Sequence, residues 1–188
     1  MTDIFEVGGI YHVYTRAIAD EKLFRNDDNY AYFLEKYRHY FNEKLETLGY
    51  CLLPNHFHLL VKVKENTTND LIIKAFSDFL NAYAKSINKV FGRNGPLFQR
   101  KFKRKKIDTE EYLTRIVTYI HLNPVKHGFT NDPSDWKYCS YKSYLSKSQS
   151  KLNRELVIVW FGGLNGFNIA HKSNTDLYLS EEFTLEKH

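Results

Sequence analysis

Apolar residues recur along the chain at two spacings, the two-residue period of β-strands and the 3.6-residue period of helices. Residues 11–16, 50–53 and 56–63 are rich in β-branched, aromatic and other apolar types, and they predict three strands. The second and third of these should pair as antiparallel neighbours, because Pro54 and Asn55 break the chain between them. A basic stretch, residues 97–107, predicts a fourth strand.

Three longer segments carry apolar residues at helical spacing. The first should begin after a cap at Asn26 or Asp27 and should end at Gly49. Its predicted apolar face consists of Tyr30, Phe33, Leu34, Tyr37, Phe41, Leu45 and Leu48.

The other two helices have clear start or stop signals. Residues 69–91 predict a long helix that Gly92 ends. Asp108 and Glu111 have the spacing of a capping box, which predicts the start of a third helix there. Pro124 is expected to end that helix, because proline lacks the backbone N–H that a helix interior requires.

This order of strands and helices indicates an α+β fold of ferredoxin-like type, an antiparallel sheet with helices on one face. From about residue 147 the composition shifts to a polar linker, and residues 152–172 predict a small C-terminal helical appendage. About a dozen final residues predict a loose tail. Residues 1–146 should therefore form the main domain, and residues 147–188 the linker, appendage and tail.

Composition narrows the class of protein. The 188 residues are 43% hydrophobic and 16% aromatic, which suits one globular core. The net charge of +5 suits a polyanionic partner. Cys51 and Cys139 have no metal-binding spacing and predict a reduced, cytoplasmic protein. The N-terminus does not look like a signal peptide, and no apolar run is long enough for a membrane helix, so no membrane is expected.

Two histidines form the first candidate site. Residues i and i+2 of a strand point to the same face, so His56 and His58 should project together while Phe57 points into the core. Two adjacent imidazoles on a sheet are half of a metal site. Taken alone, the pair fits equally well a surface histidine beside a hydrogen-bonded one.

Residues 53–60, Leu-Pro-Asn-His-Phe-His-Leu-Leu, resemble the histidine–hydrophobic–histidine motif of the IS200-like transposases, the single-tyrosine branch of the HUH nucleases. Residues 11–16, 95–103 and 119–126 resemble further blocks of this family and follow in the same order. The likeness covers roughly residues 8–145 and is greatest to the REP-associated tyrosine transposases.

Helical spacing selects one tyrosine among fourteen. Tyr119 and Asn123 are four residues apart and should share a helix face, about 6 Å from each other. Tyr112 should lie roughly 10 Å farther along the axis. The resemblance implies the same pair, with Tyr119 as the catalytic tyrosine and Asn123 as the third metal ligand. His121 should point away and serve a structural role or contact DNA.

The resemblance implies a metal-dependent endonuclease and strand transferase that acts on single-stranded DNA folded into hairpins. His56, His58 and Asn123 would hold Mg²⁺ or Mn²⁺, and Tyr119 would form a 5′-phosphotyrosine link. Relatives of this kind work as monomers or as homodimers, and both remain open here.

Basic residues predict where DNA binds. A cluster around Phe98 and Phe102 carries enough positive charge to neutralise several phosphates. A basic edge strand that blocks aggregation would also explain it, but the neighbouring candidate site favours DNA. The predicted DNA-binding residues are Arg100, Lys101, Lys103, Arg104 and Lys105 on this stretch, with Arg16 as a weaker candidate.

Two other functions remain possible from sequence. A zinc-type hydrolase would combine His56 and His58 with a third histidine such as His12, His39 or His127. A catalytically silent DNA-binding or regulatory protein would keep the fold without the chemistry.

Overall fold

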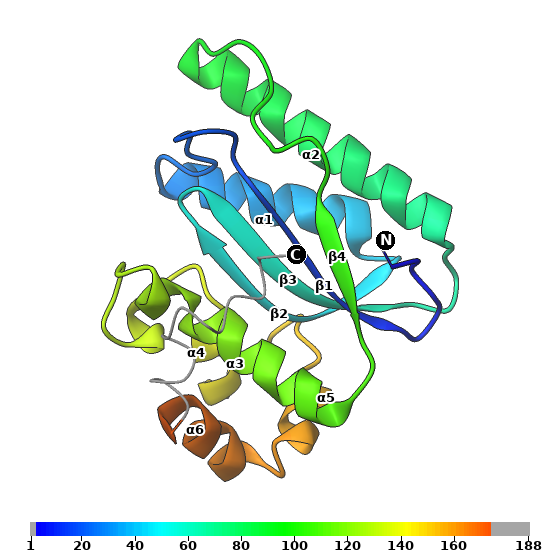
Figure 1. Ribbon diagram of the computed structural model, residues 1–188, viewed down its shortest axis with the longest axis vertical. Helices are drawn as coiled ribbons and strands as arrows, with labels where there is room; N and C mark the ends of the chain where they lie inside the picture. The colour runs from blue at the N-terminus through cyan, green and yellow to red at the C-terminus, as the bar shows by residue number, and fades with distance from the viewer. Residues whose placement is uncertain (1–2, 174–188) are drawn as a thin grey trace.

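A four-stranded antiparallel sheet lies at the centre of the computed structural model, which describes residues 3–173 (Figure 1). The strands are β1 (Ile10–Arg16), β2 (Leu45–Leu53), β3 (His56–Val63) and β4 (Lys103–Ile107). Their order across the sheet is β2-β3-β1-β4, and all neighbours are antiparallel. This is the strand order of a ferredoxin-like sandwich, so the predicted α+β class is confirmed.

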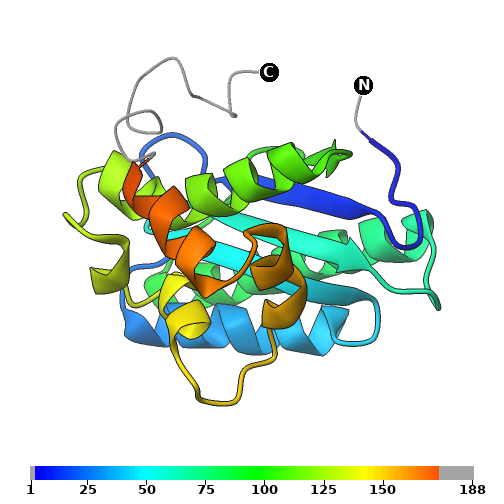
Figure 2. The same ribbon diagram turned by 90° about the horizontal axis from the view of Figure 1, so that it is seen from below.

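Helices cover both faces of the sheet, and in this detail the prediction of helices on one face is wrong (Figure 2). Two of them, α1 (Asp27–Phe41) and α2 (Asn69–Phe91), pack on one face. The third, α3 (Glu110–Lys126), packs on the other. Both faces need cover because alternate strand positions are apolar on each side, for example Phe57 toward α1 and Leu60 toward α3.

The first predicted helix is too long, since α1 ends at Phe41 and β2 already begins at Leu45. Leu45 and Leu48 keep a helix-like spacing in the sequence, but Leu45 pairs with Val63 of β3. The register shifts between Thr47 and Gly49, which marks a β-bulge. Because successive strand residues face opposite sides of the sheet, Leu45 faces α1 and Leu48, three residues later, faces α3, and this spacing imitates that of a helix.

The fourth strand is shorter than predicted. Only residues from Lys103 onward pair with β1, whereas Leu97–Phe102 form an irregular segment beside the end of β1. Its backbone still bonds there, through Ile18 N to Leu97 O at 3.0 Å and Gln99 N to Arg16 O at 2.9 Å. The segment is therefore tied to the sheet, although the strand ladder begins later.

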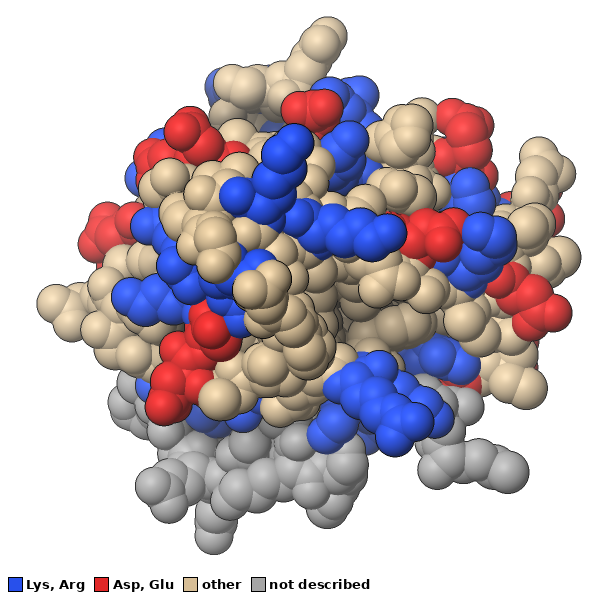
Figure 3. Space-filling model, turned by 90° about the horizontal axis from the view of Figure 1, so that it is seen from above, with Lys and Arg blue, Asp and Glu red and all other residues tan. Residues whose placement is uncertain are grey.

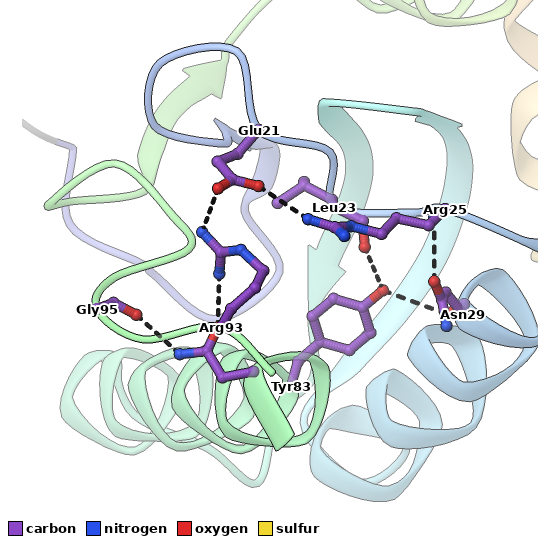
Figure 4. Close-up of polar contacts among 8 residues, drawn as sticks. Glu21, Leu23, Arg25, Asn29, Tyr83, Arg93 and Gly95 are labelled. Carbon is purple, nitrogen blue, oxygen red and sulfur yellow. Dashed lines mark hydrogen bonds and ion pairs between the residues drawn. The ribbon is translucent and has the colours of Figure 1, made fainter. Parts of the chain in front are cut away.

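Polar contacts hold the turn before this segment (Figure 4). Arg93 follows α2 and pairs with Glu21 at 2.7 Å and with Asn88 at 2.5 Å. Asn88 in turn donates to the backbone of Gly95 at 2.8 Å. The α2 boundaries themselves agree with the prediction, with Thr68 as N-cap and Gly92 at φ 60° as C-cap.

The third helix differs from the prediction at both ends. Its N-cap is Thr109, whose side chain accepts from Tyr112 N, rather than Asp108. Pro124 lies inside the helix, which continues to Lys126. Gly128, at φ 69°, ends it in a Schellman motif in which Phe129 N donates to Pro124 O at 2.9 Å.

The predicted C-terminal appendage is helical, as α5 (Arg154–Trp160) and α6 (Leu164–Ser173), but it belongs to the core on the α3 side. The 3₁₀ turn η1 (Pro133–Asp135) and helix α4 (Tyr141–Leu145) precede it, within the predicted main domain. Val157 and Phe167 are completely buried against α3 and its neighbours. The predicted loose tail lies outside the described residues.

Two further sequence expectations concern cysteines and membranes. Cys51 and Cys139 are buried free thiols on backbone segments that pair with each other. Among the helices of residues 3–173, none is both long and apolar enough to cross a membrane.

Candidate active site

The two predicted histidines stand at the start of β3, on the face that α3 covers. His56 lies opposite Arg16 of β1 and His58 lies opposite Tyr14. Both rings are buried, and their centroids are 5.2 Å apart. His56 and His58 therefore lie on one face of the sheet, as strand alternation predicted. Phe57 between them packs in the core on the opposite face.

Helix α3 brings Asn123 and Tyr119 to these histidines. Asn123 Oδ1 lies 3.4 Å from His56 Nε2, and the ring of Tyr119 meets that of His58 edge-on with centroids 5.6 Å apart. Asn123 Nδ2 donates to the carbonyl of Tyr119 at 3.3 Å, which turns the amide oxygen toward His56. Asn123 is fully buried inside the helix, which continues past it to Lys126.

The contacts of His56 fit a bound cation. Its Nδ1 faces Asn55 Oδ1 at 2.7 Å and its Nε2 faces Asn123 Oδ1. Amide oxygens only accept, and a neutral imidazole has one N–H to donate. When that N–H binds Asn55, the Nε2 lone pair points at another lone pair, and a cation between the two relieves their repulsion. Two imidazoles and an amide oxygen together form a donor set for a divalent cation.

The zinc-type hydrolase needs a third histidine as a metal ligand beside His56 and His58. His39 lies on α1, beneath the opposite face of the sheet. His12 contacts His58. The ring of His127 packs against that of His56, with centroids 4.7 Å apart. Across residues 3–173 no group of three or more His, Cys, Asp or Glu side chains is placed to hold a metal.

A cavity of about 160 Å³ opens at this end of the sheet. Its polar lining consists of Tyr14, Thr15, Arg16, His56, His58, Gln99, Lys101 and Lys103. A larger groove, about 540 Å³, lies between α2 and residues 96–104. Gln99 and Lys101 line both, so the cavity and the groove border the same segment of chain.

The predicted basic residues fall into three positions. Lys103 and Lys105 lie opposite Tyr14 and His12 of β1, on the histidine face. Arg100, Lys101 and Arg16 are exposed around the cavity and groove. Figure 3 shows one face of the molecule, on which Lys and Arg side chains gather toward the middle and most Asp and Glu side chains lie near the edges.

Arg104 points to the other face of β4. Its guanidinium packs 5.0 Å from the ring centroid of Phe5 and 5.6 Å from that of Phe102. Its Nε donates to the backbone oxygen of Asp3. Burial lowers the pKa of Arg104 from its ordinary value. These contacts hold the N-terminal segment against β4. Arg104 also lines the groove.

His121 has the structural role that was one of its two predicted alternatives. It is completely buried, and its ring nitrogens contact His171 of α6 at 2.9 Å and Ser140 Oγ at 2.8 Å. Burial holds the pKa of His121 well below its ordinary value, and His171 adds to this effect. The ring therefore joins α3 to the C-terminal segment.

Two neighbours of the site were not predicted to act together with Tyr119 and Asn123. Lys126 places its Nζ 5.6 Å from the ring centroid of Tyr119. Its position three residues after Asn123 puts it on the same helix face, a signal that spacing could have found. His12 entered only as a candidate zinc ligand, and its contact with His58 depends on strand register, which the sequence does not display.

Residues 7–123 match the family model described as "Transposase IS200 like". The chain belongs to the IS200-like transposase family. The match ends at Asn123 and so includes both histidines and Tyr119. Members of this family are transposases, enzymes that act on DNA, and the family predicted from the sequence blocks is confirmed.

Individual relatives of this IS200-like transposase agree. It is 31% identical over 148 residues to a Haemophilus influenzae protein named as a REP-associated tyrosine transposase, across 73% of this chain and 82% of that one. Its fold is similar to a solved structure of a REP-associated tyrosine transposase bound to a REP hairpin, with a TM-score of 0.63 and 19% identity. That similarity covers 78% of this chain and 85% of the other.

Proposed function

We propose that this IS200-like transposase is a metal-dependent endonuclease and strand transferase for single-stranded hairpin DNA, with Tyr119 as its nucleophile. The observation that carries the proposal is the convergence of His56, His58, Asn123 and Tyr119, from β3 and α3, within contact distance. Their mutual placement has the parts that phosphodiester transfer needs, a nucleophile beside a cation site.

The protein side chains divide the chemistry between them. His56, His58 and Asn123 would hold Mg²⁺ or Mn²⁺, which when bound stabilises the charge that develops on a non-bridging phosphate oxygen. The phenol oxygen of Tyr119 attacks the phosphorus, and the bond from phosphorus to the 3′-oxygen breaks. The phenol proton is transferred, and the 3′-oxygen leaves as a hydroxyl. One phosphodiester replaces another, so a 3′-OH can reverse the step or join a new strand.

The cavity and the groove provide a path for the single strand. A phosphate at His56 and His58 would be followed by others along Lys101 and Lys103, whose charges are exposed there. Beyond them the groove exposes Arg100, with Phe98 and Phe102 in its wall. The similar solved structure holds a hairpin, which supports a hairpin as the substrate here. The acting assembly is a monomer or a homodimer, which light scattering of the DNA complex distinguishes.

A covalent adduct is the decisive test. The full chain is incubated with single-stranded hairpin DNA and Mn²⁺, and denaturing gels report protein–DNA adduct. We expect Tyr119→Phe to lose the adduct and keep its affinity for the hairpin, because only the nucleophilic oxygen is removed. Tyr112→Phe is the matched control, a tyrosine on the same helix that lies beside Lys105, and it should keep the adduct.

Other outcomes would each reject the proposal in a different way. An adduct that survives Tyr119→Phe and disappears with Tyr112→Phe would move the nucleophile two turns along α3. Cleavage without any adduct would indicate a hydrolase. Hairpin binding with neither cleavage nor adduct would indicate a DNA-binding regulator.

A further inference from the structure

His12 contacts the proposed metal ligand His58. It lies on β1, where Tyr14 is the residue directly opposite His58, so His12 reaches His58 diagonally across the two strands. His12 Nε2 is 2.9 Å from His58 Nδ1. The exposed fractions are 1% for His12 and 0% for His58, so this bond is shielded from water. The ring of Tyr14 stacks on His12, with centroids 4.6 Å apart and planes 18° from parallel.

This one contact decides which nitrogen of His58 can bind a metal. In a hydrogen bond between two imidazoles, one nitrogen donates and the other accepts. If His12 donates, His58 Nδ1 carries the lone pair and the proton of a neutral His58 sits on Nε2, which then cannot be a ligand. If His58 Nδ1 donates, its Nε2 has the lone pair. A metal bound at Nε2 therefore requires His12 to present an acceptor.

We propose that His12 is a positioning residue for the metal site, which accepts the Nδ1 proton of His58 and so keeps the Nε2 lone pair available to the cation. This inference rests on the proposed function. Metal-binding histidines generally donate their second ring nitrogen to an oxygen acceptor, and loss of that partner weakens metal binding roughly 10- to 100-fold. Here the acceptor is another imidazole, fixed in orientation by the Tyr14 ring.

Two substitutions separate the acceptor from the shape of the ring. His12→Phe keeps an aromatic ring for Tyr14 to stack on and removes the acceptor. His12→Gln can place an amide oxygen near the position of Nε2 and restores it. Mn²⁺ affinity is measured for the full chain by EPR titration without DNA, and hairpin affinity is measured in EDTA. We expect roughly 10- to 100-fold weaker Mn²⁺ binding for His12→Phe, recovery to within a few fold for His12→Gln, and unchanged hairpin affinity in both.

Equal Mn²⁺ affinity for His12→Phe and the unchanged protein would overturn the proposal. So would a His12→Gln variant that folds and yet binds Mn²⁺ as weakly as His12→Phe. If His12→Phe does not fold, nitrogen NMR of the unchanged protein decides, because the proposal requires a proton on Nδ1 of His58. A His58 protonated on Nε2 in the presence of Mg²⁺ would overturn it.

The failure of this inference differs from failure of the proposed function. If His12 has no effect on Mn²⁺ affinity but the adduct still depends on Tyr119 and His58, only the positioning role is lost. If the adduct does not depend on Tyr119 or His58, the proposed function itself fails.

Discussion

Lys126 extends the row that Tyr119 and Asn123 form along α3. Its ammonium group lies 5.6 Å from the Tyr119 ring centroid, beside the place where a phosphate would be attacked. A fixed positive charge there should favour the negative charge of the transition state. We expect Lys126→Gln to slow adduct formation about tenfold, equivalent to about 1.4 kcal/mol.

Single-turnover adduct formation at saturating hairpin and Mn²⁺ measures this effect. Lys126→Arg is the matched control, because it keeps the charge and should keep most of the rate. A Lys126→Gln variant as fast as the unchanged protein would show that the charge plays no part in the chemical step.

For four residues of the site, local spacing was sufficient to predict which side chains lie together. The i, i+2 rule of a strand placed His56 with His58, and the i, i+4 rule of a helix placed Tyr119 with Asn123. Neither rule could bring His12 to His58, because that contact depends on the register of β1 against β3. Nor could the sequence tell on which face Arg104 would lie, since this depends on the alternation along β4.

Among the elements, the least predictable boundary was that between α1 and β2. Strand alternation sends Leu45 and Leu48 to opposite cores, and their three-residue spacing resembles that of a helix. The boundaries of α2 and β3 agreed with the prediction because each coincides with a strong local signal, Gly92 for the helix and Pro54 for the strand. Local signals thus fixed the elements whose ends do not depend on tertiary contacts.

The C-terminal helices support α3, the element that carries the proposed nucleophile. Phe167 of α6 is completely buried in the core beneath α3. We expect Phe167→Ala to lower the free energy of unfolding by about 3–5 kcal/mol, because it leaves a large cavity. Urea denaturation measures the change. Ile169→Ala, on the same helix but 54% exposed, should change stability by less than about 0.5 kcal/mol. Equal effects would mean that α6 does not pack on α3 as described.

The buried histidine pair between α3 and α6 should make stability depend on pH. Burial lowers the pKa of His171 to about 4, and that of His121 is lowered also. In the unfolded chain a histidine has a pKa of about 6.5, so the unfolded state takes up protons first as the pH falls. Stability is then complete above pH about 6.5 and is lost progressively toward pH 4, by on the order of 3 kcal/mol for His171.

Thermal unfolding between pH 7.5 and pH 4.5 measures this loss. His171 faces His121 of α3 and Tyr141 of α4, and its Nδ1 donates to Phe167 O at 2.8 Å. His171→Leu should flatten the dependence on pH, since one buried group no longer titrates. His39→Gln, an exposed histidine on α1, should leave the slope as it is. An unchanged slope in His171→Leu would exclude this pair as its source.

For the whole molecule, the arrangement of charge matters more than the net value of +5. Exposed lysines and arginines surround the cavity and the groove, whereas Lys64 follows the far end of β3. Affinity for hairpin DNA should therefore fall steeply with salt, because each neutralised phosphate releases counterions. The double substitution Lys101→Gln with Lys103→Gln should reduce the slope of log affinity against log salt by about 1.4, at about 0.7 for each single-strand contact.

Binding titrations at several salt concentrations, in EDTA, separate this electrostatic contribution from the metal. Lys64→Gln is the matched control, since it removes one positive charge without touching the cavity, and it should leave the slope unchanged. If net charge alone attracted the DNA, removal of Lys64 would lower affinity about as much as removal of Lys101 or Lys103 alone. A flat salt dependence for the unchanged protein would argue against the cavity and groove as the path of the strand, because a row of phosphates cannot lie along these lysines without displacing ions.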